Sequence, residues 1–178
     1  MSVVPKLAVV LALASAPLAA TDPAHGAAER VRAEGALTSY DAAQVPSGAW
    51  ARVQSVATSA GSTVVTLHVR GLQPSRDYGA HAHVNACGST GSAAGPHYAD
   101  VIAPSGHATD PAYANPDNEV WLDLTTDDEG NGNAQALVPW HFRAGGANSV
   151  VLHATHTHDE PGVAGTAGPR LGCLTVAF

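Results

Sequence analysis

The sequence predicts an all-β protein, built as an antiparallel β-sandwich or a Greek-key barrel. From residue 35 onward, short segments alternate apolar and polar residues at the two-residue period of a β-strand. Gly, Pro, Asn and Asp separate these segments, and no segment of useful length follows the helical period. No internal repeat is evident, so a single layered β domain is the expected architecture.

Five segments carry the strand pattern. They are GSTVVTLHVRGL (61–72), YGAHAHV (78–84), NEVWLDLTTDDEGNGNAQALV (118–138), SVVLHATH (149–156) and LGCLTVAF (171–178). Within the third segment, DDEGNGN (127–133) has the composition of a tight turn. We therefore expect the two halves of that segment to form a hairpin.

The first twenty residues have the layout of a secretory signal peptide, with Lys6, then an apolar run, then small residues. An uncleaved membrane anchor is the alternative, which Pro17 and the lack of a later long apolar stretch disfavour. Residues 21–34 are small and polar and are expected to form a flexible lead-in. The sequence thus predicts one domain over 35–178 in a protein that is secreted or held in the cell envelope, with no membrane span.

The net charge and the two cysteines indicate which partners and which cellular compartment suit the protein. Removing residues 1–20 takes away Lys6 and no acid, which changes the net charge from −7 to −8. Such a charge disfavours a nucleic-acid partner. In an exported chain, Cys87 and Cys173 are expected to form a disulfide, with free thiols or a metal thiolate as the alternative. The sequence shows no clear dimer seam, and the oligomeric state stays open.

Ten histidines are a high count for this length, and several of them share strand faces. In GAHAHV (79–84), His81 and His83 project from one face while the small apolar residues project from the other. In VVLH (150–153), His153 likewise points away from the side of Leu152. Imidazoles that project together suit copper or zinc.

Four motifs, taken in order, resemble those of the copper/zinc superoxide dismutase family. They are GAHAHV (79–84), GPHY (95–98), VVLH (150–153) and AGPRLGCLTV (167–176). The resemblance covers roughly residues 35–178. It implies an eight-stranded Greek-key β-barrel, related to the immunoglobulin-like sandwich, with the metal on its outer wall under two long loops.

The resemblance also assigns roles to single residues. It implies that His81, His83 and His153 bind copper, and that His97 is the ligand that bridges copper to zinc in the bimetallic enzymes. Cys87 and Cys173 match the intrachain disulfide of the family. Arg170 matches the arginine that attracts the superoxide anion and holds it beside copper.

The zinc half of the family's site is not matched. The connection 98–119 holds one histidine, His107, together with three aspartates, where the family supplies two histidines and an aspartate. Thr157 stands near the place of the aspartate that links the two metal sites in the family. Only 16 residues separate His153 from Arg170, fewer than in the bimetallic enzymes. In these respects the chain resembles the secreted copper-only branch, so we expect copper without zinc.

In that branch a glutamate replaces zinc as the anchor of the bridging histidine. Alternation in NEVWLDL (118–124) places Glu119 and Asp123 on the metal-bearing face, opposite the apolar residues. Glu119 is therefore the expected anchor of His97, because a ligating imidazole needs its other nitrogen held. A solvated Glu119, or Asp123 as the anchor, is the alternative.

Three other histidines lie outside the four motifs, and the resemblance assigns them no role. His156 and His158 follow His153 and are expected to be exposed polar residues, with an accessory copper or zinc site as the alternative. His107 is the only histidine available as a zinc ligand in its connection.

The expected function is that of a secreted superoxide dismutase, which converts superoxide to dioxygen and hydrogen peroxide at a histidine-bound copper. We expect His97 to leave the copper in the reduced state and to carry a proton, with Glu119 holding its ring and Arg170 binding the anion. A secreted copper-binding or copper-buffering protein with little turnover is the alternative. HATHTH (153–158) slightly favours that alternative, whereas Arg170 favours the enzyme. A structural β-sandwich with incidental histidines is a third reading.

Overall fold

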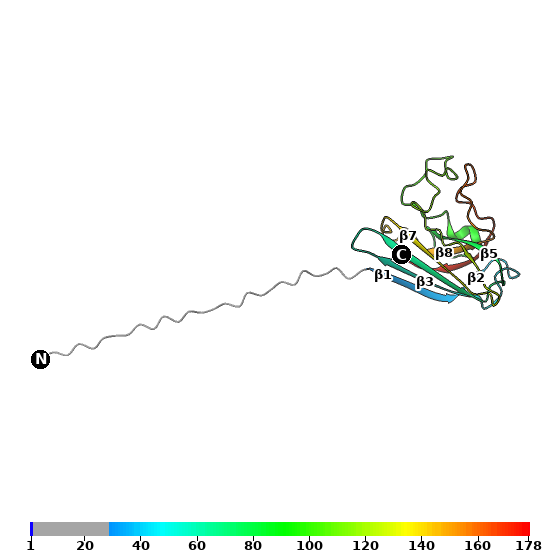
Figure 1. Ribbon diagram of the computed structural model, residues 1–178, viewed down its shortest axis with the longest axis horizontal. Coiled ribbons are helices and arrows are strands. Elements are labelled where there is room, and N and C mark those ends of the chain that lie inside the picture. Colours follow the sequence, from blue (N-terminus) through cyan, green and yellow to red (C-terminus); the bar gives the residue numbers. More distant parts are fainter. Residues whose placement is uncertain (2–28) are drawn as a thin grey trace.

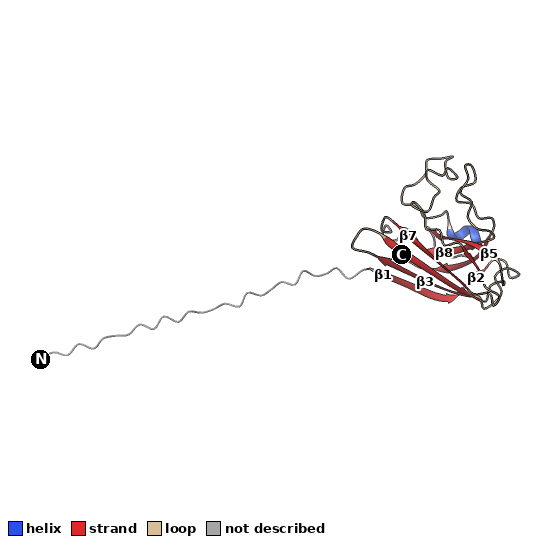
Figure 2. Cartoon of the chain, viewed as in Figure 1, coloured by secondary structure: helices blue, strands red, loops and turns tan. Residues whose placement is uncertain are grey.

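Two antiparallel sheets form the domain in the computed structural model, which describes residue 1 and residues 29–178 (Figure 1). The strands are β1 (Arg30–Ala36), β2 (Thr38–Ser39), β3 (Trp50–Ala57), β4 (Thr63–Arg70), β5 (Asp77–His83), β6 (Leu124–Thr125), β7 (Gly132–Val138), β8 (Ser149–His153) and β9 (Arg170–Thr175). One sheet has the order β1-β3-β4-β7 and the other β2-β9-β8-β5-β6. A single 3-10 turn, η1 (Gly91–Ala94), is the only helix among the described residues (Figure 2).

The predicted all-β antiparallel class is confirmed. The described residues form nine strands rather than eight, because the first strand is divided at Leu37, where the chain passes from the four-stranded sheet to the five-stranded sheet. No strand pairing closes the two sheets into a barrel among the described residues. No helix in this part of the chain is long and apolar enough to cross a membrane.

The four-stranded sheet begins earlier than we expected. β1 starts at Arg30, so the expectation of a flexible lead-in is wrong for residues 30–34. Val31 and Ala33 pack against the core while their neighbours are exposed, because RVRAE alternates apolar and polar residues like the later strands. The predicted signal peptide and residues 21–28 lie outside the described residues, apart from Met1.

The main hydrophobic core lies between the two sheets. The inner face of the four-stranded sheet contributes alternate residues such as Val53 and Leu67, and β5 and β8 contribute Ala80, Ala82 and Leu152. Burying one such valine or leucine stabilises the fold by about 1.5–3 kcal/mol. Because this face of β5 and β8 is committed to the core, their other face, including the histidines, points outward as predicted.

The expected hairpin at 127–133 is wrong in its strand pairing. The Asp127 side chain accepts hydrogen bonds from the backbone N–H groups of Glu129 and Asn131, so the turn itself forms. However, β6 pairs with β5 and β7 pairs with β4, which places the flanking strands in different sheets. Turn composition identifies a local reversal, but the partner of a two-residue strand is decided by long-range pairing.

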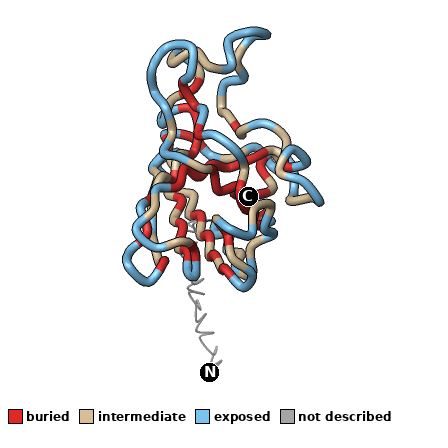
Figure 3. The backbone as a smooth tube through the Cα atoms, turned by 90° about the vertical axis from the view of Figure 1, so that its right-hand side faces the viewer, coloured by how far each residue is buried: buried red, intermediate tan, exposed pale blue. Residues whose placement is uncertain are grey.

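Two long connections, 84–123 and 154–169, rise above the five-stranded sheet on the side of β5 and β8, away from β1 and β3 (Figure 1). Their outer parts are exposed, whereas the strands beneath them are buried (Figure 3). The long loops that we expected over the site are therefore present, and they supply the remaining side chains of the site.

Candidate metal centre

Three histidines come from two adjacent strands. β5 and β8 pair so that Gly79 lies opposite His153 and His83 lies opposite Ser149. His81 and His83 project from the same face of β5, toward His153 on β8. All three are buried.

The fourth histidine arrives from the loop that follows η1. His97 forms an isolated antiparallel bridge with His83, and the next residue, Tyr98, donates its backbone N–H to the carbonyl of Ala82 over 2.8 Å. Tyr98 is buried in the core, which fixes this return of the loop against β5. The His97 and His81 ring centroids are consequently 4.0 Å apart.

The four rings form a compact group of nitrogen donors. One ring nitrogen from each of His81, His83, His97 and His153 lies within 4.8 Å of the others. Among the described residues this is the one group of three or more potential metal-binding side chains. Four imidazoles at this spacing can hold a transition metal such as copper or zinc.

Protein groups hold the other nitrogen of each ring. Nδ1–H of His83 donates to the carbonyl of Gly95 over 3.0 Å, and Nδ1–H of His153 donates to that of Gly168 over 3.2 Å. Both glycines have positive φ angles, 72° and 75°, a conformation that side-chain-bearing residues rarely adopt. The glycines of GPHY and AGPR thus aim backbone carbonyls at two of the histidines.

His81 is held by a side chain from the second long loop. Its Nε2 lies 2.8 Å from Oγ1 of Thr157, and Oγ1 lies 2.6 Å from Oδ1 of Asp123. A carboxylate only accepts, so the Thr157 hydroxyl donates to Asp123 and accepts Nε2–H of His81. Nδ1 of His81 is buried without a hydrogen-bond partner among the described residues, and this is the nitrogen left for a metal.

The nitrogens that remain fit a bound cation. With Nδ1 protonated in both rings, the Nε2 atoms of His83 and His153 present lone pairs to each other across 3.3 Å. Burial, followed by the nearby charge of His97, lowers the pKa of His83 to about 2. Burial also lowers the pKa of His153 to about 4, although the hydrogen bond to the carbonyl of Gly168 acts in the opposite direction. Burial is also the main reason why the pKa of His81 lies well below its ordinary value. These imidazoles are therefore neutral at pH 7, as metal binding requires.

Glu119 holds His97. Oε2 of Glu119 lies 2.9 Å from Nδ1 of His97, and it also accepts Nε1–H of Trp121 over 2.9 Å. Glu119 is only 7% exposed, and it reaches this position through a bridge to Ala99 on the returning loop. Asp123 lies on the same side but bonds Thr157, so the structure places it beside His81 rather than beside His97.

The sequence gives no match to any family model and no match to any curated protein. Among solved structures, the clock protein EA4 is similar with a TM-score of 0.58 and 18% identity, over 85% of this chain and 95% of that one. A double mutant of a SOD-like protein from Bacillus subtilis is similar with a TM-score of 0.55 and 14% identity, over 71% and 88% of the two chains. The fold is SOD-like. At these identities the likeness concerns the fold, and the chemistry rests on the geometry of this site.

Arg170 opens the last strand of the SOD-like domain, opposite His153. Its Nη1 donates to the carbonyl of Gly91 over 2.8 Å, and the side chain lines an open pocket with residues 90–92 and Pro96. Because Arg170 pairs opposite His153, its positive charge lies near the cluster and adds to the effect of burial in lowering the pKa of His81, His83 and His153.

The predicted disulfide is present and lies beside this arginine. Cys87 and Cys173 are bonded, with their Cα atoms 5.8 Å apart. Cys173 is in β9, three residues after Arg170, and Cys87 lies in the loop between β5 and η1. The bond therefore ties the loop that carries Gly91 and Gly95 to the strand that carries Arg170.

The other candidate histidines lie outside the cluster. The His107 side chain is 55% exposed and lies 3.3 Å from Asp110. β8 ends at His153, so His156 and His158 sit in the following loop, 3.6 Å from Asp77 and 3.7 Å from Glu160 respectively. The structure does not bring any of these three to His97.

Two residues of the site had no role assigned to them from the sequence. Trp121 holds Glu119, and Thr157 holds His81. Trp121 lies midway between Glu119 and Asp123 in the alternating segment 118–124, so the two-residue period places it on their face. The contact of Thr157 with Asp123 joins residues 34 positions apart, which strand alternation alone does not reveal.

Proposed function

We propose that this protein is a copper-dependent superoxide dismutase that works without zinc and converts superoxide to dioxygen and hydrogen peroxide. The observation that carries the proposal is the four-histidine cluster in which the Glu119 carboxylate holds Nδ1 of His97, the ring nitrogen that points away from the cluster. Nδ1 of His81 and Nε2 of the other three rings are the atoms that would hold the copper. Bound copper supplies a one-electron redox couple, which oxidises one superoxide and reduces another.

Arg170 binds the substrate in this proposal. Its guanidinium stays protonated at neutral pH, and it lies on the wall of an open pocket near the cluster. A local cation is needed because the chain as a whole has a net charge of −7 and repels an anion. Screening confines that repulsion to about 10 Å at 0.1 M salt, so the charges beside the site decide the approach.

His97 and Glu119 handle a proton. Nδ1–H of His97 is directed at the carboxylate of Glu119, so its Nε2 faces the cluster and can hold or release a proton without rotation of the ring. Reduction of superoxide to hydrogen peroxide consumes two protons, and a nitrogen at this position can deliver one of them. Trp121 keeps the carboxylate in place during that exchange.

We also propose that the protein is secreted. A disulfide between Cys87 and Cys173 is compatible with an oxidising compartment, in agreement with the signal-peptide pattern of residues 1–20. The second candidate is a secreted copper-buffering protein that retains the site but turns over little. Arg170 favours the enzyme, since a metal store has no use for an anion-binding arginine beside His153.

The test is the rate of superoxide dismutation by the exported form of the protein, loaded with one equivalent of copper and no zinc. A second sample receives added zinc. Fast turnover that zinc does not improve supports the proposal. Turnover that depends on zinc would contradict the copper-only part, and tight copper binding without turnover in either sample would favour the buffering protein.

A further inference from the structure

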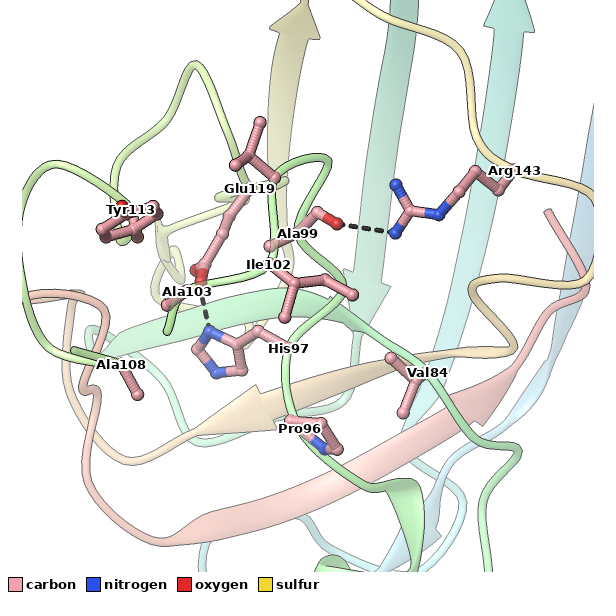
Figure 4. A pocket seen from close by; sticks show the side chains of 11 residues that line it. Val84, Pro96, His97, Ala99, Ile102, Ala103, Ala108, Tyr113, Glu119 and Arg143 are labelled. Atoms are coloured by element: carbon pink, nitrogen blue, oxygen red, sulfur yellow. Dashed lines mark hydrogen bonds and ion pairs between the residues drawn. The ribbon is translucent and has the colours of Figure 1, made fainter. Parts of the chain in front are cut away.

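A cavity of about 340 Å³ lies against His97 (Figure 4). Of the four clustered histidines, only His97 lines it, and Glu119 also contributes to its wall. The remaining wall comes mainly from the first long loop. The other lining residues are Val84, Pro96, Ala99, Val101, Ile102, Ala103, Ala108, Tyr113 and Arg143.

The cavity has the composition of a small-molecule site. Its wall is mainly apolar and includes a few residues with polar side-chain atoms, which is the pattern of ligand pockets in proteins. These residues are His97, Tyr113, Glu119 and Arg143. Val101 and Ile102 are 55% and 78% exposed at adjacent positions of the loop, although large apolar side chains are normally buried. An engineered cavity of about 150 Å³ accepts benzene, so this volume has room for one aromatic ring with substituents.

The positive charge in the wall is already neutralised. Arg143 donates to the backbone carbonyls of Ala99 and Asp100, lies 3.5 Å from the Asp100 carboxylate, and packs over the Tyr98 ring. An anionic ligand would therefore find no unpaired cation here. It would also meet the carboxylate of Glu119.

Glu119 supplies a free hydrogen-bond acceptor. Its Oε2 receives the N–H groups of His97 and Trp121, while Oε1 has no hydrogen-bond partner among the described residues. A ligand that matches this atom has a neutral hydroxyl donor. The ring of Tyr113 and the side chain of Ile102 offer the apolar surface that an aromatic ring requires.

We propose that this cavity binds a small neutral hydroxyaromatic molecule of the phenol or catechol class, with its hydroxyl donating to Glu119 and its ring among the apolar residues. The site is built from protein groups alone, so it does not depend on the copper chemistry proposed above. A ligand there would lie against His97, which is the one member of the four-histidine cluster that lines the cavity.

The test is a set of binding titrations on the metal-free protein, in which chemical-shift changes in NMR spectra report binding. The probes are phenol, toluene and benzoate, which share a ring and differ in donor and charge. We expect saturable binding of phenol that shifts Ile102 and Tyr113, about tenfold weaker binding of toluene, and no binding of benzoate. Absence of saturable phenol binding would overturn the proposal, as would benzoate binding at least as well as phenol.

Two variants and one control test where phenol binds and which group accepts its hydroxyl. Ala108→Phe places a ring at the cavity and should abolish phenol binding, whereas Val163→Phe, at an exposed position outside the cavity, should leave it unchanged. Glu119→Gln should weaken phenol binding about tenfold and leave toluene binding unchanged, because it removes a charged acceptor but no apolar surface. Equal loss for both probes in Glu119→Gln, or undiminished phenol binding in Ala108→Phe, would contradict the assignment.

Discussion

Nδ1 of His97 and Oε2 of Glu119 lie 2.9 Å apart, and the same oxygen accepts the indole N–H of Trp121. The glutamate is thus oriented from two sides, and the imidazole that it holds faces three other histidines. A carboxylate in this position fixes the tautomer and the orientation of a ligating ring, which is what a second metal does in a bimetallic site.

Glu119→Gln tests this anchor. The amide is a weaker acceptor, so we expect copper affinity to fall about 10–100-fold and dismutation to slow. Competition with a chelator of known affinity measures the first effect, and superoxide decay measures the second. Glu160→Gln, on an exposed loop residue, is the matched control. Unchanged affinity and unchanged turnover in Glu119→Gln would remove Glu119 from the site.

Thr157 provides a second test, because it connects His81 to Asp123. Thr157→Val keeps the side-chain shape and removes the hydroxyl that accepts from Nε2 of His81. We expect copper affinity to fall about tenfold or more and the electron paramagnetic resonance spectrum of bound copper(II) to change. In Thr166→Val, which loses a hydroxyl that donates to a loop carbonyl, both should stay unchanged. An unaltered spectrum in Thr157→Val would show that the hydroxyl does not orient His81.

The sequence predicted much of this site because its motifs are local. His81 and His83 share a face through two-residue alternation, and the same rule places Glu119 on the side of the histidine cluster. Alternation also runs through 30–36 and 50–57, where β1 and β3 form, although neither segment was among the predicted strands. Thr157, in contrast, is brought to Asp123 by the path of a loop, which depends on contacts distant in sequence.

Arg170→Ala should slow dismutation while copper stays bound. Arg170 supplies positive charge near His153 but offers no ligand to the cluster, so its loss removes attraction for the anion and leaves the four imidazoles in place. We expect turnover to fall roughly tenfold or more, with the difference from the wild type shrinking as salt is added. Arg32→Ala, on an exposed face of the four-stranded sheet, is the control. Full activity in Arg170→Ala would exclude the proposed role.

The disulfide should contribute to stability as well as to loop position. Cys87 and Cys173 are 86 positions apart. A cross-link that closes a loop of this size lowers the entropy of the unfolded chain, which stabilises the fold by about 4.5 kcal/mol. We expect the double variant Cys87→Ser, Cys173→Ser to lose on that order in urea unfolding. Adding a reductant should destabilise the wild type and leave the variant unaffected. An equal midpoint for the oxidised wild type and the double variant would mean that the bond contributes nothing to stability.

The buried histidines make the metal-free protein sensitive to acid. His83 and His153 have pKa values of about 2 and about 4 in the fold, both lowered first by burial, against an ordinary value of 6.5. Below pH 6.5 the unfolded chain therefore binds protons that the folded chain does not. Stability is complete above pH 6.5 and falls as the pH decreases, down to about pH 4 for His153 and about pH 2 for His83.

Between pH 6.5 and pH 5, each of these two groups should cost about 2 kcal/mol in the free energy of unfolding. Urea denaturation of the metal-free protein at the two pH values measures the loss. Replacement of His153 by Gln removes one titrating group, so that variant should show a smaller loss over the same interval. Replacement of the exposed His107 by Gln should leave the wild-type loss intact. Bound copper competes with protons for the same nitrogens, so the loaded protein should resist acid better. A metal-free protein with equal stability at both pH values would contradict neutral, buried imidazoles in the cluster.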